Sequence, residues 1–131
     1  MAKESGLGAT LNVDDSAGTA RDISNDVRDV TIATPRGVQV TTGLDVSAEE
    51  RLLLLADGSV DLTGVFNDAA NAGHDVFSVL DNVRTVSFAL SGQTLAMEML
   101  ATDYNLTRSS SGEFTYRVPM VLADGTVPTW A

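Results

Sequence analysis

The chain contains no cysteine, and this absence excludes several classes of site at once. Disulfides, thiolate zinc sites, iron–sulfur clusters and cysteine nucleophiles all need a thiol. Histidine is almost as scarce: His74 is the only one. One chain therefore cannot supply a two-histidine metal site or a histidine relay, and the position of His74 suits capping or plain solvation better than catalysis.

Positive charge is also scarce, with 8 Lys and Arg against 18 Asp and Glu and a formal charge of −10. Tight binding of nucleic acid needs clustered basic side chains that neutralise phosphates, so this balance argues against it. The acidic stretches Asp14-Asp15 and Asn25-Asp26…Asp29 could offer oxygen ligands to calcium, but the spacing of an EF-hand is absent. Acidic loops of this kind are more often simply solvated.

Long apolar runs and enzyme motifs are missing too. The longest apolar run, Leu52–Ala56, is far shorter than the ~20 residues of a membrane span, so we expect no membrane insertion. No apolar core of signal-peptide length follows Met1, so the sequence does not support export. Phosphate-binding and Gly-x-Ser-x-Gly motifs are absent as well. The residues therefore predict no enzyme activity and no cofactor.

What is present is a two-residue alternation of apolar and polar side chains. A length of 131 residues with 44% hydrophobic residues predicts one domain, residues 1–131. The alternation is cleanest over Phe114–Leu122, where Pro119 indicates an edge or a bulge, and it recurs over Val86–Leu90 and Val60–Phe66. Gln93–Leu106 also favours strand over helix. The chain is therefore predicted to be mainly β.

Two helices are expected among these strands. Ser47 and Glu50 match the Ser-x-x-Glu capping box, and the leucines that follow predict a helix over about 47–57 that ends at Gly58. Four consecutive leucines cover most of the helix circumference. Either the helix is buried between sheet and loops, or its second face, with Leu53 and Leu54, packs against another subunit. A shorter helix is predicted over 72–80.

Two segments read as long loops, Asp14–Asp22 and Thr34–Gly37. The first is small, polar and acidic, and the second interrupts what would otherwise be one continuous β ribbon. Loops of this size on a small β protein are usually functional or flexible.

Several short segments of the sequence, in their order and spacing, resemble the short major tail (tail tube) proteins of long-tailed, non-contractile phages, particularly those of actinobacteria. The resemblance covers most of the chain from about Ala9 onward. The resemblance rests on the segments Thr34–Gln39, Thr42–Asp45, Glu50–Asp57, Leu62–Asn67, His74–Phe77, Ser91–Leu95, Thr102–Arg108 and Asp124–Trp130.

The resemblance implies a β-sandwich or partly closed barrel with the 47–57 helix packed on its side and long inter-subunit loops. It implies a structural protein of the virion tail, assembled in the host cytoplasm into stacked, typically hexameric rings through which DNA passes without specific binding. The implied partners are further copies of the chain and other tail proteins such as tape measure and tail terminator. A head decoration or tail-completion protein, or a small acidic β-sandwich binding module, stays open as an alternative.

This function assigns provisional roles to individual residues. An acidic wall repels phosphates within about a Debye length of ~8 Å, so the mid-strand acids Asp61 and Glu98 are candidates for the lumen wall. The alternative is that they only solvate an outer sheet face. The candidates for subunit or ring interfaces are Leu53, Leu54, Pro35, Arg36, Asp14, Asp15 and Trp130.

Overall fold

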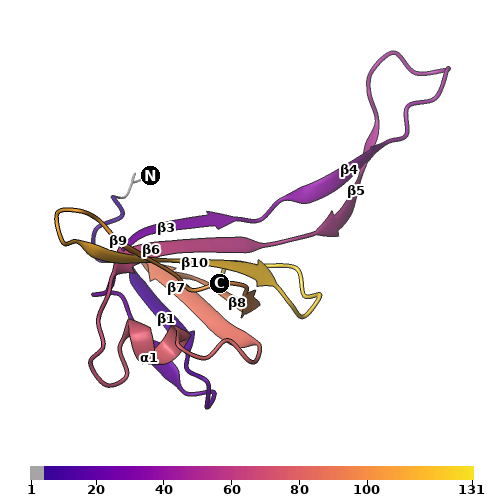
Figure 1. Cartoon of the computed structure of the whole chain (residues 1–131). Helices are drawn as coiled ribbons and strands as arrows, with labels where there is room; N and C mark the ends of the chain where they lie inside the picture. The colour runs from indigo at the N-terminus through magenta and orange to yellow at the C-terminus, as the bar shows by residue number, and fades with distance from the viewer. Residues whose placement is uncertain (1–4) are drawn as a thin grey trace.

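The computed structural model describes residues 5–131, and within this range the chain is built almost entirely of strands (Figure 1). They are β1 (Thr10–Asp14), β2 (Ala20–Asp22), β3 (Val27–Ala33), β4 (Arg36–Val40), β5 (Arg51–Ala56), β6 (Ser59–Val65), β7 (Arg84–Leu90), β8 (Gln93–Ala101), β9 (Asn105–Arg108) and β10 (Phe114–Leu122), with one short helix, α1 (Gly73–Phe77).

Eight of these strands form a single antiparallel sheet in the order β2-β1-β7-β8-β10-β6-β3, with β9 also paired to β10. The sheet does not close, because β2 and β3 end the order without pairing to each other. It curls so that one face of every long strand meets a common core, with β3, β6 and β10 in one layer and β1 and β7 in the other (Figure 1). The predicted mainly β architecture is confirmed. We call this sheet together with α1 the body.

The core follows from the alternation seen in the sequence. In β10, Tyr116, Val118 and Met120 are buried while Arg117 and Val121 are exposed, as a period of two requires. The buried hydrophobic residues form one cluster that draws on both layers: Leu11, Val13, Ile23, Val60, Leu62, Val76, Phe77, Val86, Leu95, Met97, Met99, Tyr116, Val118 and Met120.

Pro119 lies in a central strand, between β6 and the β8–β9 side of the sheet, and not at the sheet edge. The structure still accommodates its missing N–H. Its carbonyl accepts the Thr102 N–H at 3.0 Å, just where β8 has ended at Ala101 and β9 has not yet begun. The ladder is therefore interrupted at the residue that cannot donate to it.

The helix predicted over 47–57 is wrong. Arg51–Ala56 forms strand β5, paired antiparallel to β4, and 41–50 forms the loop between the two strands. Ser47 and Glu50 therefore do not cap a helix. The Glu50 N–H instead donates at 2.8 Å to the hydroxyl Oγ1 of Thr42, which lies just after the end of β4. Cross-strand pairing thus takes the place of the local helical bonds that the sequence favoured.

The helix predicted over 72–80 is confirmed only in its first part, as Gly73–Phe77. The sequence pattern predicts Val76, Phe77 and Leu80 to face inward; Val76 and Phe77 are buried, whereas Leu80 lies beyond the helix and is exposed. Arg84, 1% exposed, lies beneath the helix and donates to the carbonyls of Val76 at 2.6 Å, Val79, and Asp14 at 3.0 Å. This guanidinium therefore joins the end of α1 to β1.

Candidate assembly surface

A two-stranded ribbon projects from the body and forms the most distinctive surface of the molecule (Figure 1). It consists of β4, β5 and the loop 41–50, and we call residues 36–56 the arm. β3 leads into β4 through Thr34-Pro35, and β5 leads into β6 through Asp57-Gly58, so that the arm continues the β3–β6 ribbon of the body. The loop predicted over Thr34–Gly37 is confirmed only for Thr34-Pro35, because Arg36 and Gly37 begin β4. The Asp57 N–H donates to the Pro35 carbonyl across this break at 2.9 Å.

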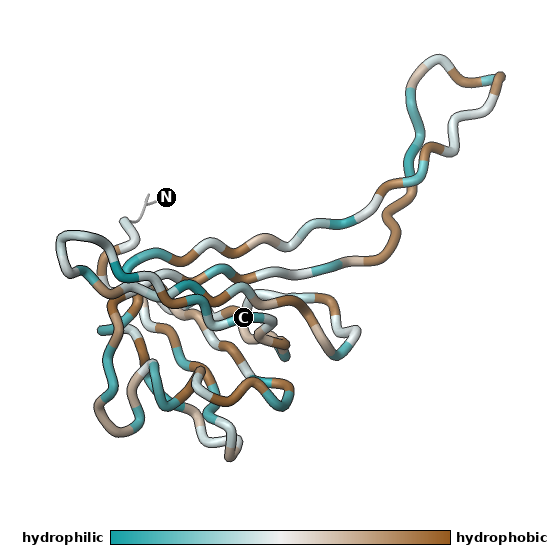
Figure 2. Tube along the Cα trace, viewed as in Figure 1, coloured by the Kyte–Doolittle hydropathy of each residue, from teal (hydrophilic) through white to brown (hydrophobic). Residues whose placement is uncertain are grey.

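The register places apolar side chains on both faces of the arm. Val38 pairs with Leu53 and Val40 with Arg51, so Val38, Val40 and Leu53 share one face. Gln39 pairs with Leu52, and a Cβ placed on Gly37 would touch the side chain of Leu54 at 3.4 Å, so Leu52 and Leu54 share the other. Figure 2 shows the hydrophobic stretch along β5.

These side chains are open to solvent in the single chain. Leu52 is 57% exposed, Leu53 65% and Leu54 44%, and Val40 is 56% exposed. An isolated two-stranded hairpin is marginal in water, and a contiguous exposed apolar patch of this kind marks a site of protein contact. The arm therefore has the composition of an interface.

Hydrogen bonds to backbone carbonyls order the arm along its length. The Thr41 N–H donates to the Glu50 carbonyl at 2.8 Å, and near the body Arg36 Nε donates to the Leu54 carbonyl at 2.9 Å. Between the two ends of the loop, Leu44 projects entirely into solvent. The arm is thus a structured ribbon with an apolar tip residue.

The structure gathers four of the predicted interface residues and separates the other three. Leu53, Leu54 and Arg36 lie on the arm and Pro35 at its base. Asp14, Asp15 and Trp130 lie on the body.

The predicted long loop over Asp14–Asp22 is wrong, because β1 and β2 form a tight hairpin across it. Asp15 organises the turn: its carboxylate accepts the N–H groups of Ala17 and Thr19, each at 3.0 Å, and pairs with Arg21 at 3.0 Å. These hydrogen bonds, that from Thr19 first and the Arg21 side chain next, lower the pKa of Asp15. The carboxylate of Asp15 is therefore occupied within its own chain.

Trp130 docks partly on its own body. It forms a β-bridge with Leu95, and its ring meets Phe88 edge-on with centroids 6.4 Å apart. The ring remains 49% exposed. An amphipathic aromatic side chain left half open in this way is suited to complete its burial against a partner.

Asp61 and Glu98 both lie on the outer face of the sheet, opposite the core, in mid-strand positions as expected. Asp61 Oδ2 pairs with Arg117 at 2.6 Å, while Asp61 Oδ1 is covered and has no partner among residues 5–131. Glu98 Oε1 accepts the Thr85 hydroxyl at 2.6 Å. The outer face around them carries threonine, serine and acids together with the exposed apolar side chains of Leu100 and Val121, which pair across β8 and β10. Arg117 largely offsets the Asp61 charge, whereas Glu98 forms no ion pair among residues 5–131.

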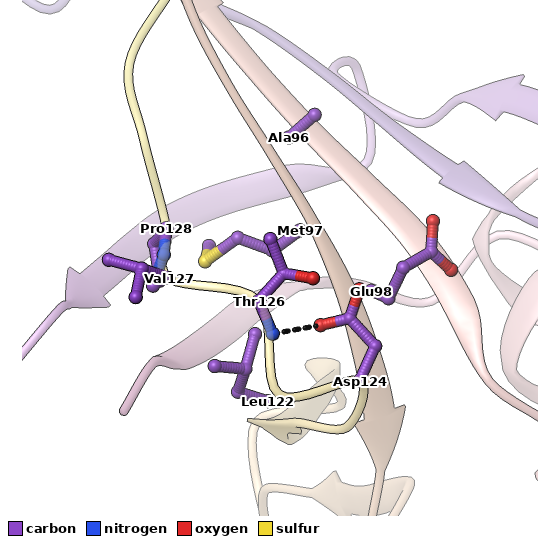
Figure 3. Close-up of a pocket in the computed structure, with 8 residues that line it drawn as sticks. All are labelled: Ala96, Met97, Glu98, Leu122, Asp124, Thr126, Val127 and Pro128. Atoms are coloured by element: carbon purple, nitrogen blue, oxygen red, sulfur yellow. Dashed lines mark hydrogen bonds between the residues drawn. The ribbon is translucent and has the colours of Figure 1, made fainter. Parts of the chain in front are cut away.

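A small pocket of about 220 Å³ opens between β8 and the C-terminal segment (Figure 3). Met97 and Pro128 form part of its apolar lining, while Glu98 and Asp124 place two carboxylates beside it, the latter accepting the Thr126 N–H at 3.0 Å. Pockets for small ligands are typically larger, about 300–1,000 Å³. The lining contains no histidine, serine or basic side chain.

The remaining candidates for chemistry have structural partners. His74 Nδ1 lies 3.2 Å from the Tyr104 hydroxyl within a cluster of aromatic rings. Asp26 Oδ1 accepts the Asn67 amide at 2.8 Å, and Oδ2 the Gly73 N–H at 3.1 Å. Within the described range, no three His, Asp or Glu side chains gather into a possible metal site, and no helix has the length and apolarity to cross a membrane.

Sequence reasoning missed the pairing that makes the arm a two-stranded ribbon, and it did not name Val38, Val40, Leu52 or Leu55 as interface candidates. A usable signal was present, because Val38 and Val40 alternate in a strand-like segment about a dozen residues before an equally apolar one. The Ser47–Glu50 capping box lies between these two segments, and it favoured a helix over 47–57 instead of a strand paired with Val38 and Val40.

No protein-family model matches the chain, and no curated protein matches it in sequence. Among solved structures, the chain is similar to a chain of "Tail of empty GTA particle computed with helical refinement, C6 symmetry", with a TM-score of 0.79 and 19% identity. It is also similar to a chain of "Virion of native gene transfer agent (GTA) particle", with a TM-score of 0.73 and 18% identity. Each match covers 98% of this chain and 99% of the other, so the similarity in fold extends over essentially both whole chains.

Proposed function

We propose that this chain is a structural tail tube subunit that assembles into stacked rings, most simply hexamers, around a conduit for DNA. The observation that carries the proposal is the arm: an ordered ribbon with leucines open to solvent on both faces, which a single chain leaves unburied. The similarity in fold to a chain of a particle tail with C6 symmetry supports both the tail and the six-fold ring.

The surfaces described above support a structural role. Asp26 and His74 have partners within their own chain, while the arm and half-open Trp130 offer apolar surface for association. We assign the protein to the virion tail of a long-tailed, non-contractile phage of the kind that infects actinobacteria, built in the host cytoplasm. Its neighbours there are other copies, the tape measure protein and the tail terminator.

The outer face of the sheet is the candidate for the lumen wall. It presents Glu98 and the Asp61–Arg117 pair among small polar side chains and the exposed Leu100 and Val121, and such a surface has little attraction for phosphates. DNA then passes along it without being held.

The test is electron microscopy of the purified protein over a range of concentrations, together with sedimentation. Long hollow tubes or stacked six-fold rings are the expected result. Discrete rings that never stack favour a head decoration or tail-completion protein instead. A chain that stays monomeric at high concentration overturns the proposal, and a melting temperature raised by calcium in that monomer identifies a binding module.

A further inference from the structure

We propose that the Asp57-Gly58 pair, at the base of the arm, is a modification site at which a succinimide forms spontaneously and converts Asp57 into isoaspartate. The modification itself does not depend on the proposed function. Its effect on assembly does rest on the proposed function.

The chain contains two Asp-Gly pairs, Asp57-Gly58 and Asp124-Gly125, and no Asn-Gly pair. Ring closure requires the nitrogen of the following residue to reach the aspartate side chain. A glycine at that position places no Cβ beside the carboxyl group and leaves the backbone free to rotate. The two Asp-Gly pairs are therefore the strongest candidates for this reaction in the sequence.

The two pairs hold their carboxylates differently. At the base of the arm, the Gly58 N–H donates to Asp57 Oδ1 at 2.8 Å, so the side chain is folded onto the nitrogen that would attack it. This nitrogen lies outside both flanking strands, because β5 ends at Ala56 and β6 begins at Ser59. Such an approach of the reacting groups favours ring closure.

The carboxylate of the second pair is turned toward a different nitrogen. Asp124 Oδ1 accepts the N–H of Thr126, one residue beyond the glycine, at 3.0 Å. The carboxylates of Asp57 and Asp124 are both open to water, so exposure does not distinguish the two pairs. The geometry therefore favours Asp57 over Asp124 as the reactive residue.

The reaction is an isomerisation in which only water is released and taken up. The Gly58 nitrogen forms a bond to Asp57 Cγ, and the proton of this nitrogen leaves with a carboxyl hydroxyl as water, closing the succinimide ring. Water then adds to one of the two ring carbonyls. Cleavage of the bond from nitrogen to Cγ restores aspartate, whereas cleavage at the backbone carbonyl carbon gives isoaspartate, whose main chain runs through Cβ and Cγ.

Isoaspartate lengthens the main chain by one carbon atom where the arm meets the body. On the arm side, the Asp57 N–H donates to the Pro35 carbonyl at 2.9 Å, and on the body side the Leu122 N–H donates to the Gly58 carbonyl at 2.9 Å. Gly58 is also closely packed, since a Cβ there would lie 3.3 Å from the sulfur of Met97, which Figure 3 shows at the small pocket. The longer linkage cannot keep both hydrogen bonds, so the arm changes its direction relative to the body.

Ageing of the purified protein below its assembly concentration, at physiological pH and temperature, tests the site. An isoaspartyl methyltransferase with a radiolabelled methyl donor then measures total isoaspartate, and peptide mapping locates it. We expect about tenfold more isoaspartate at Asp57 than at Asp124. Equal amounts at the two positions, an excess at Asp124, or no isoaspartate at all overturns the proposal.

Matched variants separate the two pairs. Asp57→Glu keeps the charge but lengthens the side chain by one methylene, which prevents closure of the succinimide ring, so methylation should fall close to background. Asp124→Glu makes the same change at the other pair and should retain most of the wild-type methylation. Methylation that is unaffected by Asp57→Glu also overturns the proposal.

The aged protein also tests the consequence for assembly. After assembly and pelleting, we expect chains with isoaspartate at position 57 to be about tenfold enriched in the supernatant over the pellet. Aged Asp57→Glu protein should assemble as well as the fresh variant. Modified chains that pellet in proportion to their abundance refute the change in arm direction. If fresh wild-type protein forms no polymer, the proposed function fails, while the isoaspartate content of the free chain still decides the modification site.

Discussion

Gly64 lies where β6, β10 and the start of β3 approach most closely, and replacing it with alanine tests how tightly the body is packed. A Cβ at this position would fall far inside contact distance of the Asp26 carbonyl oxygen and 2.9 Å from the Tyr116 hydroxyl. The same carbonyl accepts the Val65 N–H at 3.1 Å and the Tyr116 hydroxyl at 3.2 Å. The Val27/Asp29 bulge in β3 leaves this space only for a hydrogen.

The expected loss can be worked out from these contacts. Moving the Asp26 carbonyl weakens two hydrogen bonds, each contributing about 0.5–1.5 kcal/mol. Forcing a methyl group into a packed interior costs about 1–3 kcal/mol more. Gly64→Ala should therefore lower the free energy of unfolding by about 2–6 kcal/mol.

Urea unfolding followed by circular dichroism, at a concentration below assembly, measures this loss directly. Gly73→Ala is the matched control, because its Cβ would meet the same two residues, at the Asp26 carboxylate and the Tyr116 hydroxyl, at ordinary distances of 3.6 and 3.7 Å. We expect the control to remain within about 1 kcal/mol of wild type. A Gly64→Ala protein as stable as the Gly73→Ala protein would refute the close approach of these three strands.

Three further predictions address other surfaces. Arg84→Met should lower the free energy of unfolding by about 3–5 kcal/mol, because it leaves the buried carbonyls of Val76 and Asp14 without a donor; a urea midpoint close to wild type would contradict this. Trp130→Ala should reduce tube yield in a pelleting assay with only about 1 kcal/mol of lost stability, the size of its contact with Phe88; the exposed neighbour Val127→Ala is the control, and an unchanged yield counts against an interface at Trp130. Replacing Asp61 and Glu98 together with lysine should leave tubes intact and make them retain fluorescent DNA in a salt-dependent way; tubes that still bind no DNA would remove the two residues from the lumen wall.

The strands of the body could be predicted from the sequence because their burial is one-sided. Apolar side chains alternate with polar ones over Phe114–Leu122, and the structure makes this segment β10 with Tyr116, Val118 and Met120 in the core, while Phe114 at its start is exposed. Gln93–Ala101 contains good helix formers such as Leu95 and Met97, yet the alternation predicted a strand, and β8 is one. Where one face meets the core and the other meets water, periodicity outweighs intrinsic propensity.

The arm could not be predicted in this way, because its burial is not one-sided. Leu52 to Leu55 contain no alternation, and a continuous apolar run is equally compatible with a helix or with a strand covered on both sides. Ser47 and Glu50 then favoured a helix locally, whereas the structure uses the Thr42 hydroxyl to bind Glu50 across the loop. The register with Val38 and Gln39 is a long-range relation that local patterns do not contain.

Two of the interface candidates, Leu53 and Leu54, were predicted for a reason that does not depend on whether their segment is a helix or a strand. Four consecutive leucines leave more apolar surface than one side can bury, whether the segment is a helix or a strand, so Leu53 and Leu54 remain exposed candidates. Asp15 was chosen as part of a flexible loop, and the hydrogen bonds that bind its carboxylate to its own turn were not visible in composition.

The continuity between the arm and the body has a mechanical consequence. β3 and β6 pass directly into β4 and β5, and β6 is held to β10 by seven consecutive residue pairs from Val65 to Ser59. Ladder hydrogen bonds run perpendicular to the strands. A pull on the arm along its axis therefore loads the β6–β10 ladder in shear, with all of its bonds sharing the force, so a filament joined through such arms resists stretching far better than one whose links could be peeled open bond by bond.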